Sequence, residues 1–67
     1  MELKMTVKVL RLPDVMDRVG LGSSFIYLLI QRHQFPKPMR LGKRAVGWPE
    51  AEINAWLEER LAERGEV

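Results

Sequence analysis

Basic side chains without acidic neighbours fill the middle of this 67-residue chain. Residues 18–48 contain six lysines and arginines and no aspartate or glutamate, whereas residues 49–67 contain six glutamates against two arginines. The formal net charge of +2 therefore conceals a basic middle and an acidic C-terminal segment. An uninterrupted basic stretch creates a positive potential that attracts polyanions, although a solvated surface without any partner would look the same.

Uncharged polar side chains recur at helical spacing within the basic stretch. They fall at i, i+3, i+7 and i+10, opposite an apolar stripe: polar Ser24, Tyr27, Gln31 and Gln34, apolar Ile26, Leu29 and Ile30. Hydroxyl and amide groups of this kind hydrogen-bond to phosphates and to base edges. The pattern predicts a helix that enters a DNA groove, and the alternative is an ordinary solvated helix face.

Three cations surround a glycine in the segment that follows. Arg40, Lys43 and Arg44 lie around Gly42, where a protruding turn would place them on a phosphate backbone. The alternative is a loop that serves solubility alone. The two patterns, taken with Ser23 at the start of the helix and with Arg32 and Lys37 of the basic stretch, predict an interface with double-stranded DNA. Its nine residues are Ser23, Ser24, Tyr27, Gln31, Arg32, Lys37, Arg40, Lys43 and Arg44.

Catalysis finds little support in the composition. The chain has no cysteine, and its one histidine, His33, has no sequence partner for a triad or a metal site. Asp14 and Asp17 share a helix side, as solvated carboxylates often do. We therefore expect no enzyme activity, cofactor, metal or small-molecule ligand. The longest apolar run, residues 25–30, is too short to span a membrane, which favours a cytoplasmic location.

The elements that must position these residues begin near the N-terminus. Residues 6–11 favour a short strand or an extended arm. Pro13 is expected to open a short helix that ends at Gly20 in a left-handed cap, because proline suits a first helical turn and glycine suits positive φ. Gly22 or Ser23 then caps a second helix that runs to about His33. Two helices joined by so short a turn form a helix-turn-helix.

A hairpin and a third helix complete the predicted fold. Residues 39–48 favour a hairpin with Gly42 and Lys43 as a two-residue type II′ turn. Pro49 opens the last helix, and its inward stripe is expected to hold Ile53, Trp56, Leu57 and Leu61. The fold class is mainly α with a small β-hairpin, a winged helix-turn-helix. One domain should fill residues 1–67, with a core over 10–62, a flexible N-terminal arm and a C-terminal tail.

The large apolar side chains divide into expected core and expected surface. Trp48 and Trp56 should anchor the core and fix the hairpin and the third helix together. Phe25 is expected to widen the core from the edge of the second helix, whereas Leu28 is expected to be exposed. An exposed leucine is ordinary, or it contacts a thymine methyl group or a partner subunit.

Several segments together resemble the AlpA family of phage and prophage regulators, which is related to excisionases and to MerR-type winged helices. The similar segments span roughly residues 10–62: Arg11-Leu12, Gly20-Leu21, Ile26-Tyr27, Leu29-Ile30, Phe35-Pro36-Lys37-Pro38, Leu41-Gly42, Arg44-Ala45-Val46-Gly47-Trp48, Glu52 and Ala55-Trp56. The resemblance implies a DNA-binding transcription regulator encoded by a mobile element. It also implies that the second helix enters the major groove, that the hairpin is a wing, and that Ser24, Tyr27, Lys37 and Arg44 contact DNA.

The chain departs from the pattern of that family in the second helix and the turn before it. The family favours Ser at 22, Arg at 23, Thr at 25, Arg at 28, Lys at 31 and Gly at 33, and this chain has Gly22, Ser23, Phe25, Leu28, Gln31 and His33. Three expected cations are thus missing, and nonspecific phosphate binding by this helix should be weaker.

Two other functions fit the same sequence. The uncharged second helix and Leu28 fit a module that uses the helix-turn-helix shape to bind another protein. An architectural, excisionase-type protein that bends DNA would share every feature of a regulator that recruits or blocks polymerase. For a DNA-binding chain, self-association as a dimer or a cooperative array is a further expectation.

Overall fold

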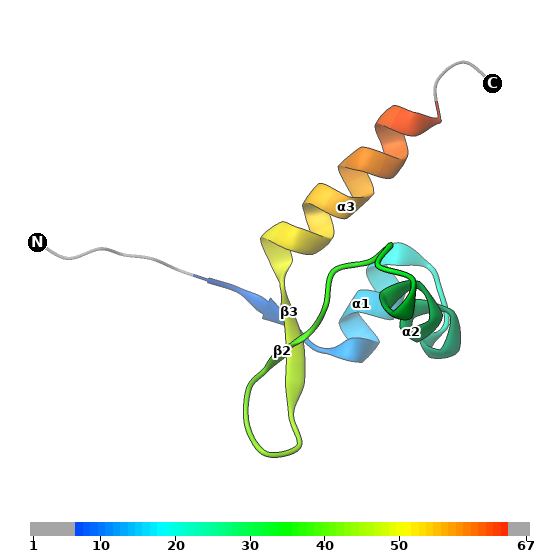
Figure 1. The fold of residues 1–67 in the computed structure, drawn as a ribbon. Helices are drawn as coiled ribbons and strands as arrows, with labels where there is room; N and C mark the ends of the chain where they lie inside the picture. The colour runs from blue at the N-terminus through cyan, green and yellow to red at the C-terminus, as the bar shows by residue number, and fades with distance from the viewer. Residues whose placement is uncertain (1–6, 65–67) are drawn as a thin grey trace, which may run out of the picture.

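Three short helices and three strands form the part of the chain that the computed structural model describes, residues 7–64 (Figure 1). In chain order they are β1 (Val9–Leu10), α1 (Leu12–Val19), α2 (Ser23–Gln31), β2 (Met39–Arg40), β3 (Val46–Pro49) and α3 (Glu50–Glu63). The strands form an antiparallel sheet in the order β1-β3-β2, and α1, α2 and the β2–β3 hairpin make the predicted winged helix-turn-helix. Most of the expected N-terminal arm and the end of the C-terminal tail lie outside the described residues.

Helix α1 confirms the signals at both of its ends. It begins one residue before Pro13, and Asp14 lies in its first turn, where the helix dipole favours an acidic side chain. Gly20 follows the last helical residue with φ of 71°, and its N–H donates to the Met16 carbonyl at 2.8 Å. This left-handed residue ends α1 and, with Leu21, forms the turn to Gly22, the N-cap of α2.

Helix α2 ends two residues earlier than predicted, at Gln31 rather than His33. His33 has φ of 58°, the one non-glycine residue between positions 7 and 64 with positive φ. Its N–H donates to the Ile30 carbonyl at 3.0 Å, and the Gln34 N–H donates to the Leu29 carbonyl at 2.8 Å. These two bonds make a Schellman ending, in which the left-handed residue is most often glycine. Periodicity alone does not reveal it because histidine occupies that position.

The tip of the wing also differs from the prediction. Met39 pairs with Gly47 and Arg40 with Val46, and the Leu41 N–H donates to the Ala45 carbonyl at 2.7 Å. Three residues, 42–44, therefore form the tip in place of a two-residue turn, and the type II′ turn is wrong because Gly42 lacks the positive φ that it requires. Burial sets the register, since a shift by one residue would exchange half-buried Met39 with exposed Arg40.

Strand β3 and helix α3 enclose the core from one side. The buried side chains come from every layer of the fold: Leu10, Val15, Ile26, Phe35, Trp48 and Ile53. Gly47 is needed in β3, because a Cβ atom there would lie 2.6 Å from Cγ1 of Val9 and 3.0 Å from the Leu10 carbonyl oxygen. Strand β1, one of the two forms expected for residues 6–11, is thereby packed tightly against the wing strand.

The inward stripe of α3 is shorter than predicted. Ile53 is fully buried and Trp56 and Leu57 are partly buried, but the Leu61 side chain is 57% exposed. The helix leaves the body of the molecule after its first turns, so its last turns have nothing to pack against (Figure 1). The described helices are all too short or too polar to cross a bilayer.

The two tryptophans join the wing strand and α3 to the same segment, the one that follows α2. The indole N–H of Trp48 donates to the Pro36 carbonyl at 2.9 Å, and that of Trp56 donates to the Gln34 carbonyl at 2.8 Å. Phe35 lies between Gln34 and Pro36 in the sequence, and its ring meets the Trp56 ring edge to face with the ring centres 4.8 Å apart. Trp48 is a core residue as predicted, whereas Trp56 is only partly buried.

Candidate nucleic-acid interface

Helix α2 presents the predicted polar face to solvent. Ser24, Tyr27 and Gln31 are exposed, and Ser23, in the first turn, is half-buried. The orientation follows from Ile26, which is fully buried and holds the opposite face of the helix in the core. Hydroxyl and amide groups on such a face can donate to and accept from base edges and phosphate oxygens.

The segment after α2 carries two of the predicted cations. Arg32 is the C-cap of α2 and is exposed, and Lys37 is exposed within the stretch that leads to β2. The two indole hydrogen bonds to the carbonyls of Gln34 and Pro36 hold this backbone in place. Lys37 therefore extends from a fixed segment beside α2, and it does not depend on a long loose loop.

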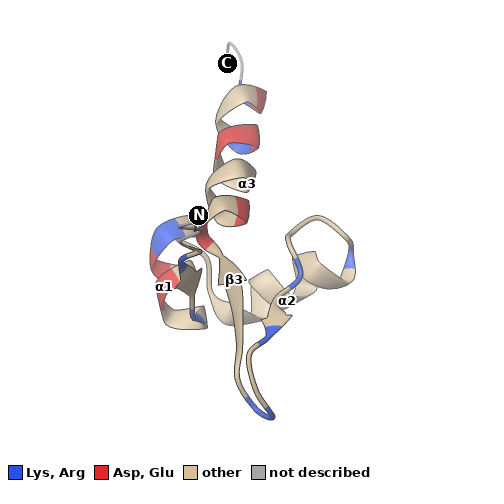
Figure 2. Cartoon of the chain, turned by 90° about the vertical axis from the view of Figure 1, so that its left-hand side faces the viewer, with Lys and Arg blue, Asp and Glu red and all other residues tan. Residues whose placement is uncertain are grey.

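The wing carries the other three predicted cations. Arg40 lies on β2, Lys43 and Arg44 lie in the tip of the wing, and all three side chains are exposed. The tip protrudes from the body of the molecule and carries basic residues (Figure 2). Their backbone is braced at the base by the Arg11 side chain, whose Nε donates to the Val46 carbonyl at 3.0 Å. Arg11, which belongs to the family-like segments but not to the predicted interface, thus supports the wing from the start of α1.

The basic stretch divides into one structural arginine and five cations that make no ion pair with another described residue. Arg18 binds α3, with its guanidinium 2.9 Å from the Glu50 carboxylate and 3.3 Å from the Asn54 side-chain oxygen. The ion pairs within residues 7–64 involve only Arg18 and Arg60 as cations. Within residues 18–48, the cations left for a polyanion are the five of the predicted interface: Arg32, Lys37, Arg40, Lys43 and Arg44.

The described glutamates all lie on α3, which extends away from the wing, whereas Asp14 and Asp17 lie on α1. The tip of the wing and the C-terminal end of α3 point in opposite directions in both views, and the glutamates lie on α3 and its start (Figures 1 and 2). The separation keeps the carboxylates away from the wing cations. A phosphate backbone that approaches α2 and the wing therefore meets positive charge without strong repulsion from α3.

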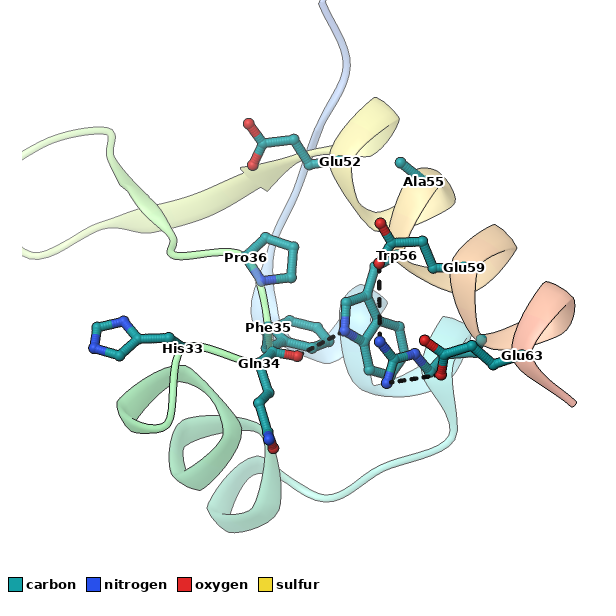
Figure 3. Close-up of a pocket in the computed structure, with 10 residues that line it drawn as sticks. His33, Gln34, Phe35, Pro36, Glu52, Ala55, Trp56, Glu59 and Glu63 are labelled. Carbon is teal, nitrogen blue, oxygen red and sulfur yellow. Dashed lines mark hydrogen bonds and ion pairs between the residues drawn. The ribbon is translucent and has the colours of Figure 1, made fainter.

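A groove of about 650 Å³ lies between α3 and residues 33–36 (Figure 3). Glu52, Glu59 and Glu63 line it, which makes it unsuitable for a phosphate. Arg60 fills part of the groove, 4.8 Å from the centre of the Trp56 ring and 3.8 Å from the carboxylates of Glu59 and Glu63. The imidazole of His33 points away from Trp56 (Figure 3). Among residues 7–64 no cluster of His, Cys, Asp and Glu is arranged to hold a metal ion.

Apolar side chains share the outer face of α2 with the polar ones. Phe25 is 48% exposed, so the prediction that it widens the core is wrong, and Leu28 is 37% exposed as expected. Phe25 is rotated by about 100° around the helix from Ile26, so it lies at the edge of the buried stripe, next to Leu29, rather than within it.

Comparison with known proteins identifies a family and two relatives. The family described as "Prophage CP4-57 regulatory protein (AlpA)" matches residues 8–61. The chain is 38% identical over 66 residues to the "DNA-binding transcriptional activator AlpA" of Escherichia coli strain K12, with 90% of this chain and 94% of that protein covered. It is 42% identical over 57 residues to the "Uncharacterized protein ORF88" of Enterobacteria phage P4, where 85% of this chain spans 65% of the phage protein.

Proposed function

Because the chain belongs to the AlpA family of prophage regulatory proteins, we propose that it is a sequence-specific DNA-binding regulator of transcription. In this proposal α2 enters the major groove and the β2–β3 wing lies on the phosphate backbone. The Escherichia coli relative is described as a DNA-binding transcriptional activator, which supports the same class of function here. The proposed role is regulatory and requires no cofactor.

One observation carries the proposal. Five exposed cations without an ion-pair partner in the described residues accompany an uncharged polar helix face, and the glutamates of α3 lie away from the wing. Neutralised phosphates release counterions, so such cations provide affinity that is independent of sequence. The side chains of α2 then provide the contacts to base edges that distinguish one site from another.

A salt titration of DNA binding tests the wing. Replacement of Lys43 and Arg44 by glutamine should lower the slope of log K against log salt by about two, since each phosphate contact contributes about 0.9 on duplex DNA. The matched control replaces Arg60 and Arg64 of α3 by glutamine, which removes the same charge far from the wing tip. Equal effects of the two pairs would mean that net charge, rather than wing contact, controls affinity, and would refute the assignment.

A protein-interaction module remains the second candidate, because Phe25 and Leu28 leave apolar surface on the outer face of α2. For a module that binds only proteins, a titration with random duplex DNA should show no steep dependence on salt.

DNA bending is a separate question, and circular-permutation gel shifts with the selected site would measure it for this chain. A bend that appears only with the bound protein supports an architectural role.

A further inference from the structure

The outer face of α2 is unusual for a helix that reads DNA, because it carries no charge. Residues 23–31 contain no lysine, arginine, aspartate or glutamate, and three of their large side chains are substantially exposed. Phe25 is 48% exposed, Tyr27 is 42% exposed and Leu28 is 37% exposed. These apolar side chains on the outside of α2 are not covered by any other part of the described chain. Their apolar character therefore indicates which kind of group α2 contacts on a partner.

The winding of the helix places these side chains relative to the core. Ile26 is fully buried and marks the inward direction. Ser24 and Leu28 are each two residues from it, so each is rotated by about 160° from the inward direction and lies near the centre of the outer face. Phe25 and Tyr27 are each one residue from Ile26, so they lie about 100° from the inward direction, one on each side of the outer face. Ser24 and Leu28 are therefore the side chains that reach furthest toward a groove.

The major groove offers one apolar group among its base edges, the C5-methyl of thymine. Guanine is most often read by arginine or lysine, which α2 lacks, whereas adenine is read by glutamine, which α2 has at Gln31. We infer that Leu28, with Phe25 beside it, contacts thymine methyl groups, and that the part of the binding site under α2 is rich in A·T pairs. The inference rests on the proposed function, since it names what α2 reads once it lies in the groove.

The removal of single methyl groups from the DNA tests this inference directly. The probe is a duplex recovered by selection from randomised double-stranded DNA, in which each thymine under α2 is replaced in turn by deoxyuridine. That change removes the methyl group and keeps the hydrogen-bonding pattern. The wild-type chain should bind about fourfold more weakly for each methyl group contacted, the equivalent of about 0.8 kcal/mol for one buried methyl.

Two leucine variants assign the effect to a residue. Leu28→Ala should bind the thymine and deoxyuridine duplexes equally at the position that Leu28 contacts. Leu61→Ala removes an exposed leucine from α3 and should keep the full wild-type difference. The wild-type measurement needs no variant, so the test stands even if Leu28→Ala folds poorly.

Each alternative outcome is distinct. Equal affinity of the wild-type chain for every thymine and deoxyuridine duplex would overturn the inference and leave DNA binding intact. A Leu28→Ala variant that keeps the full wild-type difference between the thymine and deoxyuridine duplexes would also overturn it, because Leu28 would then make no contact with the methyl group. Failure of the wild-type chain to bind the selected duplex or random DNA would refute the proposed function and the inference with it.

Discussion

Substitution of His33 by glycine should stabilise the protein. His33 holds φ of 58° at the end of α2, a conformation that costs an L-amino acid about 1–2 kcal/mol and costs glycine almost nothing. Histidine tolerates this region better than most residues, so the lower end of that range applies. Glycine loses about 0.5 kcal/mol more chain entropy on folding, which leaves a gain of about 0.5 kcal/mol.

Thermal unfolding followed by circular dichroism measures the effect. In a domain of this size, a gain of about 0.5 kcal/mol raises the melting temperature by about 2–4 °C. The matched control is Arg32→Gly, one residue earlier, where φ is −91° and glycine brings only the entropy cost. Arg32→Gly should therefore lower the melting temperature. If both glycines move it in the same direction by the same amount, the backbone of His33 does not limit stability.

Three further changes test the packing that positions the interface. Gly47→Ala places a Cβ atom 2.6 Å from Cγ1 of Val9, so it should cost about 1–3 kcal/mol in urea unfolding, and an unchanged midpoint would contradict the close approach of β1 and β3. Trp56→Phe removes the donor to a solvent-accessible carbonyl and should cost about 1 kcal/mol, whereas a neutral result would show that this hydrogen bond contributes nothing. Arg18→Met removes a half-exposed ion pair with Glu50 and should cost at most about 1 kcal/mol, and a double-mutant cycle with Glu50→Gln should return a coupling energy of that size rather than none.

Much of the fold follows from local signals that act within a few residues. Pro13 and Gly20 bracket α1 because their backbone preferences suit the two ends of a helix, and Pro49, the last residue of β3, is the N-cap of α3. The signals fail where tertiary structure decides. The end of α2 depends on a left-handed histidine, and the wing tip depends on which of two neighbouring residues, Met39 or Arg40, the sheet buries.

The sequence predicts which polar and basic residues are accessible at the candidate interface. It does not predict which apolar side chains are exposed or which cation is held in an ion pair. All nine predicted contacts are exposed or half-buried, because polar residues at helical spacing and cations around a turn have few other places to lie. Phe25 and Leu61 show the limit of periodicity. Their spacing fits a buried stripe, but whether a stripe is covered depends on the partner, and α3 extends beyond the body that would cover Leu61. Arg18 likewise belongs to the basic stretch in the sequence, but in the structure it forms an ion pair with Glu50 of α3.

The central claim is that α2 and the wing together form the DNA-binding surface, and amide chemical shifts test it most directly. The ¹⁵N-labelled chain would be titrated with its selected duplex. We predict that the largest shifts fall in residues 23–32 and 40–44, while residues 52–63 of α3 remain near their free positions. Shifts concentrated on α3 and its groove, with the wing and α2 unaffected, would contradict the account.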